Sequence, residues 1–124
     1  MEIKIENLTK AYGDFKAVDN MNLNIADGEL VGLLGPSGCG KSTTLFMLAG
    51  LNDPTSGHIY FGGKDVTKVA PEDREIGLVF QNYALYPHMT VADNIMFPLI
   101  NRKVPKAEAR ERARRWQSLC SLII

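Results

Sequence analysis

The sequence predicts an α/β fold in which a small antiparallel β layer precedes a strand–loop–helix core. Apolar residues alternate with polar ones over residues 2–8 and 21–25, which predicts two half-exposed strands. A continuous apolar run of strand length follows at 29–34, as expected for a strand buried on both faces. Helix formers then extend from Lys41 to a stop signal at Gly50. The 124 residues are enough for one small domain with a core.

The loop between the predicted buried strand and the helix matches G-x-x-x-x-G-K-[ST], a phosphate-binding pattern. Its residues are Gly35, Pro36, Ser37, Gly38, Cys39, Gly40, Lys41, Ser42 and Thr43. Glycines allow positive φ, and successive backbone N–H groups then point into a concavity that suits phosphate oxygens. The following helix adds the positive end of its dipole. We expect Lys41 on the β- and γ-phosphates of a nucleotide and the Ser42 hydroxyl on Mg²⁺. A glycine-rich turn with an incidental lysine is disfavoured by the strand–loop–helix context.

The rest of the chain alternates short strands and helices. A short strand is predicted at 58–61, and one helical turn is predicted to begin at Pro71. A second buried strand is predicted at 76–80, ending at Gln81. After an irregular aromatic-rich link, Thr90 and an acid three residues later predict the start of a helix. Pro105 opens a last helix, whose residues at helical spacing are Ala109, Ala113, Trp116 and Cys120.

Charge is unevenly spread, although the net charge is zero. Residues 1–100 carry seven Lys/Arg against twelve Asp/Glu, and residues 101–124 carry seven Lys/Arg against two Glu. A basic tail can bind nucleic acid or anionic lipid, but a solvated helix face is the favoured interpretation. No apolar run reaches bilayer-spanning length, and no signal peptide is indicated. Two cysteines do not suggest a disulfide framework, which favours a reducing, cytosolic location.

Taken together, the motifs resemble the N-terminal half of an ATP-binding-cassette (ABC) ATPase, over about residues 1–115. The resemblance rests on Tyr12, on 35–43, on the link at 53–59, on the strand end at 79–81 and on 83–95. It implies a P-loop NTPase core of ABC type, with Tyr12 stacking on adenine and Gln81 contributing to Mg²⁺ binding. From the residues alone, an ordinary turn aromatic is the favoured interpretation of Tyr12, and Gln81 is equally well an ordinary polar strand end.

The resemblance implies a division into residues 1–81, the β layer with the P-loop core, and 82–124, the start of a helical subdomain. The segment 83–97 is then expected to face transmembrane permease subunits. Plain core packing is the alternative for its apolar residues, which are Tyr83, Leu85, Tyr86 and Met89. Asp93 is expected to cap a helix rather than bind metal, and His88 to lie on the surface.

By resemblance, the chain is an energy-coupling subunit of an importer for sugars, glycerol phosphates or polyamines. Such a subunit binds ATP and Mg²⁺, pairs with a second ATPase subunit, and lies in the cytoplasm on the inner face of the membrane. No nucleic-acid partner is expected.

The sequence lacks the family's strand ending in Asp-Glu, its L-S-G-G-Q-like signature and its switch histidine. We therefore assign no catalytic residue and expect background ATP hydrolysis. A non-enzymatic nucleotide- or permease-binding fragment, or a non-functional remnant, is the alternative; a small kinase or GTPase is disfavoured.

The chain ends on apolar residues at 116–124, after a family-like helix at 108–115. Our hypothesis is a truncated or frameshifted reading frame, with the register lost near 114–116 and the fold interrupted after the start of the helical subdomain. The predicted strands at 30–34 and 76–80 would then present open apolar edges, which predicts marginal solubility.

Overall fold

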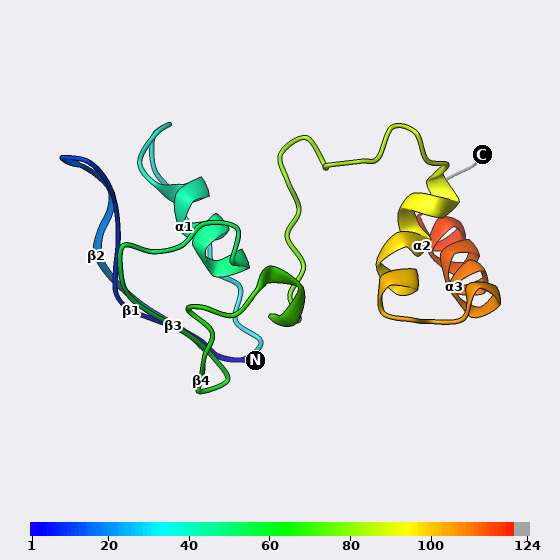
Figure 1. Ribbon diagram of the computed structural model, residues 1–124, viewed down its shortest axis with the longest axis horizontal. Helices are drawn as coiled ribbons and strands as arrows, with labels where there is room; N and C mark the ends of the chain where they lie inside the picture. The colour runs from blue at the N-terminus through cyan, green and yellow to red at the C-terminus, as the bar shows by residue number, and fades with distance from the viewer. Residues whose placement is uncertain (121–124) are drawn as a thin grey trace. The chain divides into compact units, whose positions relative to one another are not determined.

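The computed structural model describes residues 1–120. It divides into two compact units, Met1–Leu78 and Val79–Ile124, which we describe separately. Figure 1 shows the strands and α1 in the first unit and α2 and α3 in the second. In chain order the elements are β1 (Ile3–Tyr12), β2 (Phe15–Ile25), α1 (Lys41–Ala49), β3 (Ser56–Phe61), β4 (Lys64–Asp65), the 3-10 helix η1 (Pro71–Asp73), α2 (Val91–Asn101) and α3 (Lys106–Leu119).

The first unit is built on a four-stranded sheet in the order β2-β1-β3-β4, with every neighbouring pair antiparallel. Ile5 in β1 lies opposite Leu23 in β2 and Ile59 in β3, so one face of the sheet is aliphatic. Alternation along β1 and β2 places these side chains on the same face. The predicted antiparallel layer is therefore confirmed, and its first two strands are longer than the sequence pattern indicated.

The core of this unit forms where α1 packs against the aliphatic face of the sheet. Ile5, Leu8, Met47 and Ile59 are fully buried in one cluster, with Met47 as the contribution from α1. The helix ends as predicted, because Gly50 takes a left-handed conformation (φ 80) and its N–H bonds the carbonyl of Met47. The P-loop helix is thus held by the antiparallel layer.

The prediction of buried strands at 29–34 and 76–80 was wrong for the described residues, where neither segment belongs to a sheet. Leu30 and Leu34 are 97% and 96% exposed, and Val79 is 80% exposed. A parallel strand needs hydrogen-bonded neighbours on its edges, and local apolar composition does not supply them. These segments therefore form irregular backbone, in which Leu30, Leu34 and Val79 are exposed while Ile76 packs against the core of the first unit.

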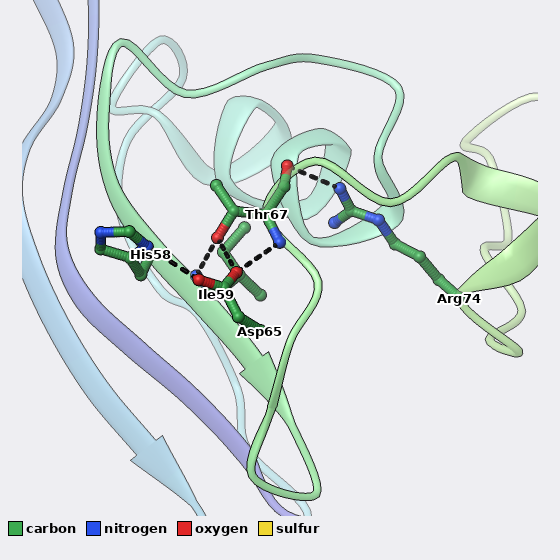
Figure 2. A network of polar contacts seen from close by, with 5 residues as sticks. All are labelled: His58, Ile59, Asp65, Thr67 and Arg74. Atoms are coloured by element: carbon green, nitrogen blue, oxygen red, sulfur yellow. Dashed lines mark hydrogen bonds and ion pairs between the residues drawn. The ribbon is translucent and has the colours of Figure 1, made fainter.

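A polar network holds the segment that follows β3 (Figure 2). The Thr67 hydroxyl donates to Asp65 at 2.6 Å and accepts from the Ile59 N–H at 2.9 Å, and His58 Nδ1 lies 3.0 Å from Asp65. Hydrogen bonds from the Thr67 side chain and N–H, with a smaller effect of His58, hold the pKa of Asp65 below its usual value.

Arg74 connects the same segment to the end of α1. Arg74 is 4% exposed, and its guanidinium donates to the carbonyls of Met47 (2.9 Å), Leu48 (3.0 Å), Thr67 (3.1 Å) and Val69 (2.9 Å). Its donors therefore satisfy carbonyls in the last turn of α1, where a cation is also favoured by the helix dipole. Burial lowers the pKa of Arg74. The helical turn predicted at Pro71 is confirmed as η1, and Arg74 is the residue that directly follows it.

The second unit is a helical pair. Thr90 caps α2 by accepting the N–H of Asp93 at 3.1 Å, as predicted, and α2 continues through Pro98 to Asn101. Ala109 and Ala113 of α3 are buried with Met96 of α2. Trp116 is 59% exposed and Cys120 is also exposed, so the predicted apolar stripe is buried only in its first half within the described residues.

Candidate functional site

The phosphate-binding loop runs from Gly35 to Gly40 and ends on the first residue of α1. Gly40 is the N-cap, with φ 91, and no acidic residue lies in the first turn of the helix. The positive end of the helix dipole is therefore not neutralised by an acid of its own first turn. Thr44, which is buried, donates its hydroxyl to the Gly40 carbonyl at 2.8 Å and fixes this turn.

Gly40 has a steric reason to be glycine in addition to its positive φ. A Cβ built at this position would lie 2.2 Å from the carbonyl oxygen of Ala17 and 3.3 Å from Cγ2 of Val18, both on β2. Because the nearest atom belongs to the backbone, no side-chain rotation would relieve the clash. The close approach of Gly40 to β2 therefore locks the end of the loop onto the sheet.

The Lys41 ammonium lies inside the curve of its own loop. It donates to the carbonyl oxygens of Gly35 at 2.5 Å and Pro36 at 2.8 Å, and lies 3.3 Å from Cys39 Sγ. These are oxygen acceptors at the position where the pattern predicts phosphate oxygens. The following residue, Ser42, is exposed in the first turn of α1.

A pocket of about 250 Å³ adjoins the loop, between α1 and β2. Its lining includes Val18, Met21, Leu33, Lys41 and Thr44. Ligand pockets are commonly about 300–1,000 Å³. The pocket is therefore smaller than a whole nucleotide requires, and a nucleotide would extend beyond it.

Tyr12 lies at the end of the β1–β2 hairpin and is 53% exposed. It pairs with Phe15, which is two residues along β2 from Ala17, the residue that Gly40 contacts. At a rise of about 3.3 Å per residue, this places the Tyr12 pair about 7 Å along the strand from the loop contact. The first unit therefore brings Tyr12 to the same end of β2 as the phosphate-binding loop.

Gln81 belongs to the second unit, where it is exposed in a turn rather than at the end of a strand. Its role toward Mg²⁺ stays a prediction, as do the roles of Tyr12, Lys41 and Ser42.

The aromatic-rich segment that follows is largely exposed. Tyr83 and Leu85 are 73% and 69% exposed, Tyr86 is 40% exposed, and His88 lies on the surface as predicted. The Tyr86 ring contacts Phe97, with centroids 4.8 Å apart.

Sequence reasoning missed three residues that support this region: Lys10, Asn52 and Arg74. Asn52 and Lys10 contact Tyr12, and Arg74 binds the end of α1. Only Lys10 had a local signal, since residues two apart on a strand share a face. The contact of Asn52 with Tyr12 joins residues 40 positions apart in the sequence, and the contact of Arg74 with Met47 joins residues 27 positions apart.

Comparison with known proteins matches residues 18–123 to the ABC transporter family model. The chain is 51% identical to the Fe(3+) ions import ATP-binding protein FbpC of Brucella abortus (strain 2308), over 97% of this chain and 34% of that protein. It is 56% identical to the oligosaccharides import ATP-binding protein MsmX of Bacillus subtilis (strain 168), over 90% of this chain and 31% of that protein. The chain thus spans about a third of the length of these relatives.

Among solved structures, the chain is similar to a dimeric ATP-binding cassette in a post-hydrolysis state bound to ADP and Pi. The TM-score is 0.82 at 34% identity, covering 98% of this chain and 58% of that one. The family model covers most of the sequence, and the fold of the matched cassette agrees with it. The chain therefore belongs to the ABC transporter family.

Proposed function

We propose that this chain carries the nucleotide-binding part of the ATP-binding subunit of an ABC importer and binds MgATP through residues 35–43. The observation that carries the proposal is the position of the Lys41 ammonium, held by the carbonyls of Gly35 and Pro36 within its loop. Phosphate oxygens entering the loop would replace these carbonyls as acceptors and gain a charge-assisted bond. The uncompensated N-terminus of α1 adds to the attraction.

The residues present fit a magnesium nucleotide. The exposed Ser42 hydroxyl is a hard oxygen ligand, which Mg²⁺ accepts together with phosphate oxygens. We propose Gln81 as a second oxygen ligand and Tyr12 as the platform for adenine. Bound Mg²⁺ would neutralise charge on the β- and γ-phosphates. The chain's own part is then to hold the phosphates with Lys41 and the backbone N–H groups of the loop.

Binding is tested by titrating the chain with MgATP in a calorimeter. Wild-type binding that is lost in Lys41→Ala supports the proposal, since this variant removes the cation and leaves the backbone of the loop. Lys64→Ala serves as a control, because it removes one exposed lysine from β4, outside the loop. Equal affinity of wild type and Lys41→Ala would refute a phosphate site at this loop.

The same reasoning leads us to propose background ATP hydrolysis. The sequence contains neither an Asp-Glu strand end nor an L-S-G-G-Q-like signature, so a general base and a clamp on the γ-phosphate are missing from these 124 residues. Turnover above background that disappears in Lys41→Ala would contradict this. A non-enzymatic nucleotide- or permease-binding role is the second candidate function.

We propose residues 83–97 as a contact for transmembrane permease subunits. The exposure of Tyr83, Leu85 and Tyr86 supports it, because an exposed aromatic and aliphatic cluster is typical of an interaction surface. No helix within residues 1–120 has the length and apolar character required to cross a membrane. We propose that the protein lies in the cytoplasm, on the inner face of the membrane. We also propose that a second ATPase subunit pairs with it in the complete assembly, and that the boundary between the P-loop core and the helical subdomain lies at residues 81/82.

FbpC and MsmX are named for Fe(3+) ions and oligosaccharides and are 51% and 56% identical to this chain, so similar identity accompanies different named solutes. Co-purification with a candidate permease, and its loss in Tyr83→Ser/Leu85→Ser, tests the docking proposal. Undiminished co-purification of the double variant would refute a contact at this segment.

A further inference from the structure

Tyr12 is held in place by side chains of the loop that follows α1 and of its own strand. Asn52 Nδ2 donates to the Tyr12 hydroxyl at 2.9 Å. The Lys10 ammonium lies 5.2 Å from the centroid of the Tyr12 ring and donates to the Asp53 carbonyl at 2.5 Å. One end of the ring is therefore hydrogen-bonded and one face is covered by a cation.

The anchor of Tyr12 is itself connected to α1. The N–H groups of Leu51 and Asn52 donate to the carbonyl of Phe46 at 2.9 and 3.3 Å, just past the helix end at Gly50. Thr55, at the other end of this loop, accepts the Ala11 N–H at 3.0 Å. The loop after α1 is thus fixed both to the helix and to the strand that carries Tyr12.

Without these contacts, an aromatic side chain at an exposed hairpin end would sample several rotamers. Tyr12 is 53% exposed, so packing alone does not select one of them. Asn52 reaches the ring from 40 residues away in sequence. The contact therefore restricts an exposed ring whose neighbours in sequence form a tight turn.

We infer that Asn52 is a positioning residue that orients the Tyr12 ring to stack on the purine base of a nucleotide whose phosphates occupy residues 35–43. Because the Lys10 ammonium lies over one face of the ring, the base would stack on the opposite face. This inference rests on the proposed function. It also means that α1 organises both ends of the nucleotide, the phosphates at its N-terminus and the base through the loop at its C-terminus.

The expected losses of MgATP affinity follow from the conformational freedom that the Tyr12 side chain regains when Asn52 is replaced. Releasing one rotamer-rich side chain costs about 2- to 12-fold in affinity. Removing an aromatic that stacks on a base costs about 5- to 150-fold. Asn52→Ala is therefore expected to weaken binding of MgATP by about 2- to 12-fold, less than Tyr12→Ala does.

The test compares the affinity of the full chain for MgATP with its affinity for magnesium tripolyphosphate, which has no base. Asn52→Ala, Tyr12→Phe and the double variant are measured together, since each single change removes one partner of the hydrogen bond. The control is Asn24→Ala, because Asn24 is exposed on β2 opposite Lys4, at the far end of the hairpin from Tyr12. Lys41→Ala reports separately on the phosphate site.

The expected result is weaker MgATP binding in Asn52→Ala with unchanged tripolyphosphate binding, a similar loss in Tyr12→Phe, and no further loss in the double variant. Additive losses, an equal loss for both ligands, or no effect of Asn52→Ala would each overturn the inference. If Lys41→Ala abolishes binding while Asn52→Ala is neutral, the proposed function stands and this inference fails. Wild type that binds neither ligand overturns both.

Discussion

Replacement of Gly40 by alanine tests whether the close approach of the loop to β2 stabilises the first unit. Gly40 has φ 91, and a Cβ there would lie 2.2 Å from the Ala17 carbonyl oxygen. Gly28 has a comparable φ of 77 but has no heavy atom within 4 Å of a Cβ built on it. The two glycines therefore share the conformational cost and differ in the steric one.

The magnitudes can be separated on this basis. A Cβ in the left-handed region costs about 1–2 kcal/mol, which is the whole effect expected for Gly28→Ala. Moving the Gly40 Cβ out to an ordinary contact requires backbone displacement, and overpacking of this kind adds about 1–3 kcal/mol. We expect Gly40→Ala to lower the free energy of unfolding by about 2–5 kcal/mol in total. This is a large fraction of the stability of a small domain.

The assay is urea denaturation followed by far-UV circular dichroism, with MgATP affinity measured on the folded fraction. Gly40→Ala is expected to lower the unfolding midpoint by more than Gly28→Ala does and to weaken MgATP binding, whereas Gly28→Ala leaves MgATP affinity unchanged. Equal midpoints for the two variants would show that the contact with Ala17 does not constrain the loop, and would refute the steric argument.

Three further predictions concern stability and solubility. Arg74→Met should lower the free energy of unfolding by about 2–4 kcal/mol, because it leaves the carbonyls of Met47 and Leu48 at the end of α1 without their hydrogen-bond donor. An unchanged denaturation midpoint would contradict this. The hydrogen bonds that lower the pKa of Asp65 stabilise the fold above about pH 4, and this contribution is lost as the pH falls through the pKa of the folded state. Asp65→Asn should therefore flatten the acid limb of a curve of stability against pH. An acid limb identical to that of the wild type would refute this. Leu30→Lys/Leu34→Lys should raise solubility, measured by precipitation, and change the free energy of unfolding by no more than about 0.5 kcal/mol, because both side chains are exposed; a large loss of stability would show that they are packed.

Features with local signals were predictable from the sequence. Gly50 ends α1 because glycine adopts the left-handed conformation without strain, and Thr90 caps α2 through the N–H three residues on. The loop at 35–40 matches a pattern that specifies glycines, and Gly38 and Gly40 take the positive φ that glycine allows without strain. Each of these depends on contacts between residues close in sequence.

Features that depend on distant partners were not predictable. The segments at 29–34 and 76–80 have strand composition, but a strand forms only with hydrogen-bonded neighbours, and the sheet of the described residues does not include them. The contacts of Asn52 with Tyr12 and of Arg74 with α1 link side chains tens of residues apart. Neither leaves a periodic or motif signal in the sequence.

The burial of Met47 against the antiparallel sheet has a consequence for the order of assembly. Met47 shares a core with Ile5, Leu8 and Ile59, while the segment that leads into the phosphate-binding loop remains solvent-exposed at Leu30 and Leu34. Chains emerge from the ribosome N-terminus first and fold in units as they do so. The helix that bears Lys41 is therefore anchored by the strands on either side of it in the sequence, without a contribution from the apolar segment at 29–34. A nascent chain would therefore pack α1 onto the sheet once β3 has emerged, before the residues of the second unit are made.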